Sequence, residues 1–192
     1  MAIRQPTWGD NYVMPPTMTA ADLLHLPDDG ARNELYEGAV VREEMTGPGH
    51  GDICHRLSGE LYAYAKVQGF HNRILQNSLF DLTPVGSLRK TVLAPDVAIM
   101  RQTVLQSRQQ IPTEPPLLAV EVVSPLQTLA ELGMKAQFYR NAGVDEVWLI
   151  DQDTRVVEIW NAVGITSLPE GQSLTSQLLP GFSIAVTYLL DG

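Results

Sequence analysis

A single acidic residue inside an almost wholly apolar segment is the feature that most constrains the fold of this chain. The segment covers residues 117–123, LLAVEVV, and its one charged residue is Glu121. Such a run is typical of a central strand that other elements cover on both faces. A carboxylate there costs free energy unless it is paired or bound to a metal ion. We therefore interpret Glu121 as a candidate metal ligand, with a strand-end salt bridge as the alternative.

A second carboxylate has a similar setting one predicted strand earlier. Asp96 lies in residues 93–100, LAPDVAIM, where Pro95 favours extended backbone before it and donates no hydrogen bond. If the two strands are neighbours, Asp96 and Glu121 can point at one ion. Mg²⁺ binds one or two carboxylates together with water and phosphate oxygens. The alternative for Asp96 is a turn or strand-entry residue.

Helix and strand signals along the chain predict an α/β (α+β) fold. Residues 1–18 are expected to form an extended N-terminal arm and residues 19–192 a single domain. Thr19 and Asp22 are a candidate capping box for a first helix. Further helices are expected at about 50–68 and 126–142. Strands are expected at residues 34–41 (two short strands turning at 37–38), 73–82, 92–100, 117–123, 146–151, 155–160 and 182–190.

Lys135 lies in the predicted helix that follows the apolar strand. Glu131 is four residues before it, a spacing that also suits a surface ion pair. A lysine directed at a metal site could instead orient the attacking water or stabilise charge on a phosphate.

A small group of possible soft ligands occurs near the start of the second predicted helix. His50 and Cys54 are four residues apart, and His55 is adjacent, so two ligands for a structural zinc ion could share one helix face. Ordinary packing is the alternative for Cys54.

The order of several short motifs carries a family resemblance. They are residues 34–38 (ELYEG), His50, Pro95-Asp96, residues 121–125 (EVVSP), Lys135 with Tyr139, and residues 147–151 (VWLID). This order resembles the restriction-endonuclease-like family of the PD-(D/E)XK nuclease superfamily, over roughly residues 18–190. The resemblance implies a restriction-endonuclease-like core, in which helices flank a mixed central β-sheet.

The resemblance also implies roles for individual residues. Asp96 and Glu121 match the family's metal ligands, and the backbone carbonyl of Val122 matches the position that adds a third protein oxygen. The lysine expected two residues after Glu121 is replaced by Val123. Family members supply this amine from the following helix, which nominates Lys135.

Two further positions match residues near such sites. Glu34 could hold a second ion or a water, and His50 could contact phosphate or assist proton transfer. The implied activity is a Mg²⁺- or Mn²⁺-dependent endonuclease acting on DNA. A homodimer is expected, because duplex cleavage commonly needs two active sites.

Composition sets limits on this interpretation. The net charge of -9 argues against a strong non-specific nucleic-acid binder, whose affinity comes largely from basic side chains on phosphates. It favours the alternative of a catalytically silent nuclease-fold module for binding or assembly. Cys54 is the one cysteine of the chain, so no intrachain disulfide can form. No apolar run reaches the roughly 18 residues of a membrane span and no secretory signal is evident, so a cytoplasmic location is expected.

Overall fold

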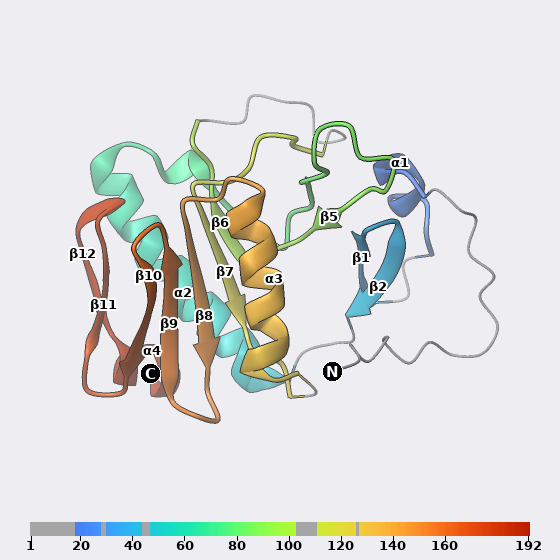
Figure 1. Cartoon of the computed structure of the whole chain (residues 1–192). Helices are drawn as coiled ribbons and strands as arrows, with labels where there is room; N and C mark the ends of the chain where they lie inside the picture. The colour runs from blue at the N-terminus through green and yellow to red at the C-terminus, as the bar shows by residue number, and fades with distance from the viewer. Residues whose placement is uncertain (1–17, 28–29, 44–46, 103–110, 126) are drawn as a thin grey trace.

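The computed structural model describes residues 18–27, 30–43, 47–102, 111–125 and 127–192. Its centre is a six-stranded sheet with the spatial order β10-β9-β8-β7-β6-β3 (Figure 1). The β7–β8 pair is parallel and the other described pairs of this sheet are antiparallel. The strands are β3 (Ile74–Gln76), β6 (Val97–Ile99), β7 (Leu118–Val122), β8 (Glu146–Asp151), β9 (Val156–Asn161) and β10 (Gly164–Pro169). The predicted mixed central sheet is confirmed.

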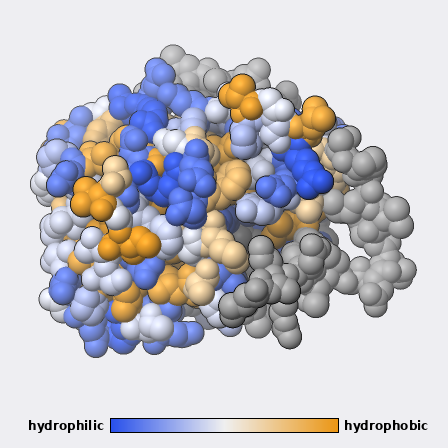
Figure 2. Space-filling view, viewed as in Figure 1, coloured by the Kyte–Doolittle hydropathy of each residue, from blue (hydrophilic) through white to orange (hydrophobic). Residues whose placement is uncertain are grey.

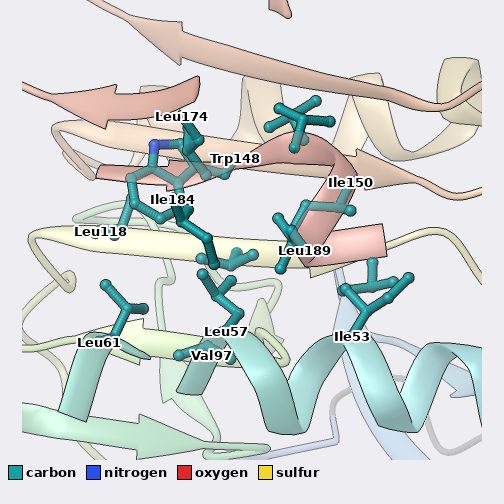
Figure 3. Close-up of a cluster of buried hydrophobic side chains, with 14 of the residues drawn as sticks. Ile53, Leu57, Leu61, Val97, Leu118, Trp148, Ile150, Leu174, Ile184 and Leu189 are labelled. Carbon is teal, nitrogen blue, oxygen red and sulfur yellow. The ribbon is translucent and has the colours of Figure 1, made fainter. Parts of the chain in front are cut away.

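Two long helices cover opposite faces of this sheet (Figure 1). On one face, α2 (Pro48–Gln68) places Leu57 in a buried cluster that includes Leu118 of β7 (Figure 3). On the other face packs α3 (Leu129–Asn141), which connects β7 to β8, and Ala119 of β7 is buried there. Successive residues of β7 therefore enter different cores, which explains the apolar run of its sequence.

A smaller sheet lies beside the central one, with the order β2-β1-β5-β4 (Figure 1). Its strands are β1 (Arg32–Tyr36), β2 (Ala39–Glu43), β4 (Phe80–Asp81) and β5 (Val92–Leu93). The short helix α1 (Ala20–Leu23) packs against it through Leu23, which shares a cluster with Leu35. The predicted capping box of Thr19 and Asp22 is present, and the predicted hairpin joins β1 to β2.

Two predicted strands, at 73–82 and 92–100, are each divided between the two sheets. The first contains β3 and β4, and the second contains β5 and β6. The second break falls at residues 94–96, where Pro95 has no N–H to give to a ladder. The predictions of two continuous strands were therefore wrong. The division has a functional consequence, because it places Asp96 where the two sheets meet.

The C-terminal part closes the cluster on the α2 side of the sheet. The hairpin β11 (Ser173–Ser176) and β12 (Leu179–Ala185) leads into helix α4 (Val186–Asp191). A strand predicted to continue to residue 190 is wrong beyond residue 185, because Leu189 is buried against α2 and the sheet from a helix (Figure 3). A single 3₁₀ turn, η1 (His71–Arg73), follows α2.

The described surface mixes polar and apolar residues. Exposed apolar side chains include Met134, Val163 and Ile165, and Figure 2 shows hydrophobic residues scattered among hydrophilic ones on the face with α3. Among the residues described, no helix is both long and apolar enough to cross a bilayer. The predicted arm lies outside the described residues except for Met18, which is buried.

Candidate active site

The two carboxylates singled out in the sequence lie on neighbouring strands. β6 and β7 are antiparallel, with Val97 opposite Val120, so continuing this register by one residue places Asp96 opposite Glu121. Their side chains contact different helices, because Asp96 lies against His50 of α2 whereas Glu121 lies against Lys135 of α3. Each of the two residues is 2% exposed. The expectation that their strands are adjacent is confirmed.

Asp96 is held by three donors at the start of β6. Its Oδ2 accepts the backbone N–H of Val122 at 2.8 Å and lies 3.2 Å from Nε2 of His50. Its Oδ1 accepts from Nη1 of Arg32 at 3.1 Å. Burial acts to raise the pKa of Asp96, but the His50 hydrogen bond, the Arg32 charge and the Val122 N–H together keep it below its ordinary value. The group is therefore a carboxylate at neutral pH.

Glu121 forms part of a second network with helix α3. Its Oε1 accepts a hydrogen bond from the hydroxyl of Tyr139 at 2.7 Å and lies 2.9 Å from Nζ of Lys135. The same ammonium lies 3.0 Å from Oε1 of Glu34. That oxygen also accepts the backbone N–H of Ala94 at 2.6 Å. Lys135 thus joins a carboxylate of the central sheet to a carboxylate of the smaller sheet.

The local structure explains why Lys135 faces inward. The carboxylate of Glu131 is engaged in the capping box of α3, where it accepts hydrogen bonds from Thr128. A surface ion pair between Glu131 and Lys135 was the alternative expected from the sequence. In the structure Glu131 caps the helix instead. The helix starts at Leu129, later than predicted, because Thr128 is its N-cap.

Arg32 is a site residue that sequence analysis missed. Its Nη1 donates to Asp96 and to the Asn77 side chain, whose Oδ1 is 2.9 Å away. The backbone N–H of Asn77 also donates to the carbonyl of Asp96 at 3.2 Å. A signal existed, since Arg32 and Glu34 are two residues apart and therefore share a face of β1. The predicted strand began at Glu34, so this spacing was not used.

His50 approaches Asp96 from the first turn of α2. Its Nδ1 lies 3.6 Å from Sγ of Cys54, one helical turn later. Burial, followed by the negative charge of Asp96, raises the pKa of the Cys54 thiol. The thiol is therefore neutral at physiological pH, and it is not an activated nucleophile. His55, the third member of the predicted cluster, does not belong to this group of ligand atoms.

The donor set fits a hard divalent cation. Among the described residues of the two networks, the carboxylates of Glu34, Asp96 and Glu121 outnumber the fixed cations of Arg32 and Lys135 by one, and a bound cation would offset this excess. The five residues proposed from the sequence therefore fall into two networks, Asp96 with His50 in one and Glu34, Glu121 and Lys135 in the other.

The backbone at this end of β7 also suits a cation. The β6–β7 register would place Pro95 opposite Val122. Proline has no N–H, so it cannot offer the Val122 carbonyl the ladder hydrogen bond that another residue would. Carbonyl oxygens are accepted ligands for hard cations.

Comparisons with known proteins agree with this fold. A crystal structure described as a putative nuclease belonging to DUF820, from Anabaena variabilis ATCC 29413, superimposes with a TM-score of 0.71. The two sequences are 17% identical, and the match covers 88% of this chain and 96% of that one. A search among curated proteins found no match. The Uma2 family, described as "Putative restriction endonuclease", matches residues 20–187. This match spans most of the chain and includes every residue of the two networks, so the protein belongs to the Uma2 family of restriction-endonuclease-like nucleases.

Proposed function

We propose that this protein is a divalent-metal-dependent endonuclease that hydrolyses phosphodiester bonds in DNA. The observation that carries the proposal is the burial of two carboxylates, Asp96 directly before β6 and Glu121 on the neighbouring strand β7, with the Lys135 ammonium 2.9 Å from Glu121. Two buried carboxylates and an amine are the groups that metal-assisted phosphodiester hydrolysis needs. Membership of a nuclease family supports the same class of reaction.

Asp96, Glu121 and the Val122 carbonyl would hold Mg²⁺ or Mn²⁺. Such an ion polarises the scissile phosphate and lowers the pKa of a coordinated water. Lys135 holds a proton on Nζ beside Glu121, where it can orient the attacking water or stabilise negative charge on the phosphate. Glu34 fixes the position of that ammonium through its own 3.0 Å contact.

Two further residues would act on the DNA backbone. The side chain of Arg32 is 21% exposed although it pairs with Asp96, so a ligand in solvent can reach part of it. A guanidinium binds phosphate oxygens through paired donors. His50 would hold its hydrogen bond to Asp96 and offer an imidazole for phosphate contact or proton transfer.

A cleavage assay with matched variants tests the proposal. Purified protein is incubated with single- and double-stranded DNA and RNA, each with Mg²⁺, Mn²⁺ or EDTA. Asp96→Asn and Glu121→Gln keep the side-chain shapes and should abolish cleavage, and Lys135→Ala should reduce it by about 100-fold or more. Asp153→Asn, at an exposed aspartate of a turn, should leave it unchanged. Undiminished cleavage by Asp96→Asn would contradict the proposal.

A catalytically silent nuclease-fold module is the second candidate. The observation in its favour is that both carboxylates already bind internal cations, Arg32 on Asp96 and Lys135 on Glu121. The net charge of -9 also opposes tight binding to DNA phosphates. This candidate predicts no cleavage under any metal condition. Isothermal titration calorimetry gives a second test. For a silent module, the heat measured on adding Mg²⁺ should be the same for the unmodified protein and for Glu121→Gln.

The proposal includes a homodimer. A single metal site cuts one strand, and cutting both strands of a duplex at one place calls for a second site. Sedimentation with and without a short DNA duplex measures the stoichiometry. A chain that nicks one strand as a monomer would remove this part of the proposal.

A further inference from the structure

His50, Cys54 and Asp96 form a group with three different kinds of ligand atom. The proposed hydrolysis gives no role to Cys54. The His50 ring lies between two other side chains, with Nδ1 3.6 Å from Sγ of Cys54 and Nε2 3.2 Å from Oδ2 of Asp96. One ligand atom from each residue lies within 4.8 Å of the other two. The three residues come from the first turns of α2 and from the start of β6.

We infer that His50, Cys54 and Asp96 form a site for a borderline or soft divalent cation such as Zn²⁺ or Cd²⁺. Thiolate and imidazole ligands select such ions, whereas Mg²⁺ favours oxygen ligands throughout. The site therefore differs in chemistry from the proposed Mg²⁺ site, although both use Asp96. Three protein ligands leave one position of a tetrahedral ion for water or another ligand.

The observed separations are close to those of a tetrahedral site. Zinc bond lengths imply ligand atoms roughly 3.3 to 3.7 Å apart, and the 3.6 Å between Cys54 and His50 already falls in this range. One ring nitrogen must serve both neighbours, so the other two pairs of ligand atoms have to close by up to about 1.5 Å from their limit of 4.8 Å. Small rotations of the His50 and Asp96 side chains supply such a shift without moving the helix.

Charge also favours a divalent ion. On binding, the thiol loses its proton to solvent, and the sulfur becomes the metal ligand. The thiolate of Cys54 and the carboxylate of Asp96 then carry two negative charges, which the ion and the Arg32 guanidinium beside Asp96 offset together. The i, i+4 spacing on α2 keeps Cys54 and His50 on one face of a rigid element, so little backbone ordering is needed.

Sharing of Asp96 gives the site a consequence for activity, and this part rests on the proposed function. An ion that recruits the Asp96 carboxylate toward Cys54 and His50 removes it from a Mg²⁺ ion held with Glu121. Occupancy of the two sites is therefore exclusive. We expect Zn²⁺ or Cd²⁺ to inhibit Mg²⁺-dependent cleavage through Cys54.

Ultraviolet titration with Cd²⁺ tests binding independently of cleavage. Cys54 is the one cysteine in the chain, so a thiolate-to-cadmium charge-transfer band can come from no other residue. The full-length protein should develop this band with one Cd²⁺ per chain. Cys54→Ser should lack the band, and Glu121→Gln should keep it. Asp96→Asn or His50→Gln should weaken Cd²⁺ binding by about 100-fold. Loss of a residue that only hydrogen-bonds to a metal ligand already lowers metal affinity by about 10- to 100-fold.

The outcomes separate this site from the proposed function. Absence of the band in the unmodified protein, or Cd²⁺ affinity unchanged by both Asp96→Asn and His50→Gln, overturns the inference. In the cleavage assay, Cys54→Ser should cut with Mg²⁺ at the rate of the unmodified protein. The Zn²⁺ concentration that halves this rate should be at least tenfold higher for Cys54→Ser. Equal Zn²⁺ inhibition of Cys54→Ser overturns the link to activity. If no variant cleaves but the band forms as expected, the nuclease proposal fails and the metal site stands.

Discussion

Replacing Lys135 by methionine takes one ammonium away from two buried carboxylates. Its Nζ lies 3.0 Å from Glu34 and 2.9 Å from Glu121, and the lysine side chain is 12% exposed. At an effective dielectric constant of 20, one such pair has a Coulomb energy of about 5.5 kcal/mol before desolvation is subtracted. Removing one partner of a buried ion pair costs about 3–5 kcal/mol in practice. We expect the free energy of unfolding to fall by an amount in that range.

The loss is not doubled by the second contact, because each carboxylate keeps another donor. Glu34 retains the Ala94 N–H, and Glu121 retains the Tyr139 hydroxyl. Adding Glu121→Gln to Lys135→Met removes one of the two uncompensated charges. The double variant should therefore regain about 1–3 kcal/mol relative to Lys135→Met alone, which is the coupling typical of residues in one network.

Urea unfolding at neutral pH in EDTA measures these differences. Lys66→Met is the matched control, because Lys66 is exposed on α2; it should change the free energy of unfolding by less than about 0.5 kcal/mol. A loss for Lys135→Met no larger than that of Lys66→Met would refute the buried network. So would a double variant that is less stable than Lys135→Met.

Three further outcomes follow from the same contacts. Tyr139→Phe removes the 2.7 Å hydrogen bond to buried Glu121, and urea unfolding should show a loss of about 1–3 kcal/mol. The lowered pKa of Asp96 means that its stabilisation is complete above the unfolded-state pKa of about 3.9 and is lost as pH falls through the lower folded value. Asp96→Asn should therefore show a shallower loss of stability on acidification in EDTA. Arg32→Gln removes a resident cation from Asp96 and should tighten Mg²⁺ binding by about tenfold, or 1.4 kcal/mol, in calorimetry.

The parts of the fold that could be predicted are those that depend on residues close together in the sequence. The apolar run around Glu121 predicted β7 because a doubly covered strand needs apolar residues on both faces. Thr19 and Asp22 predicted the start of α1 through their capping box. The equivalent pair of Thr128 and Glu131 was present in the sequence but was not used, which is why α3 was placed three residues too early.

The division of two predicted strands could not be found in the same way. Residues 92–100 are apolar throughout apart from Pro95 and Asp96, and both halves do form strands. Which sheet each half joins depends on partners distant in sequence, Leu35 for Val92 and Val120 for Val97. A hydrophobic pattern reports burial but carries no information about the identity of the neighbouring strand.

The same limit applies to the site. Asp96 and Glu121 were predictable because a buried charge is conspicuous in an apolar strand. Arg32 belongs to a mixed polar stretch, ARNELY, where its two-residue spacing from Glu34 indicates a shared strand face but does not identify Asp96 as its partner. Its contact with Asp96 exists because residues 94–96 connect β5, which pairs with β1, to β6 in the other sheet. The identity of that partner is visible in the three-dimensional structure alone.

The internal cations connect the stability of this site with its chemistry. Asp96 and Glu121 are buried, and without a metal ion their charges are offset by Arg32 and Lys135. These ion pairs offset the charges of the buried acidic groups from within the chain, whereas at some other sites metal binding supplies the folding energy. In the proposed function, a metal ion would compete with these resident cations, and its affinity would depend on how easily Arg32 leaves Asp96. DNA phosphates can favour that exchange, because they offer the displaced guanidinium a new anionic partner. Metal and substrate binding would then reinforce each other, and calorimetry should show tighter Mg²⁺ binding to Glu121 and Asp96 when DNA is present.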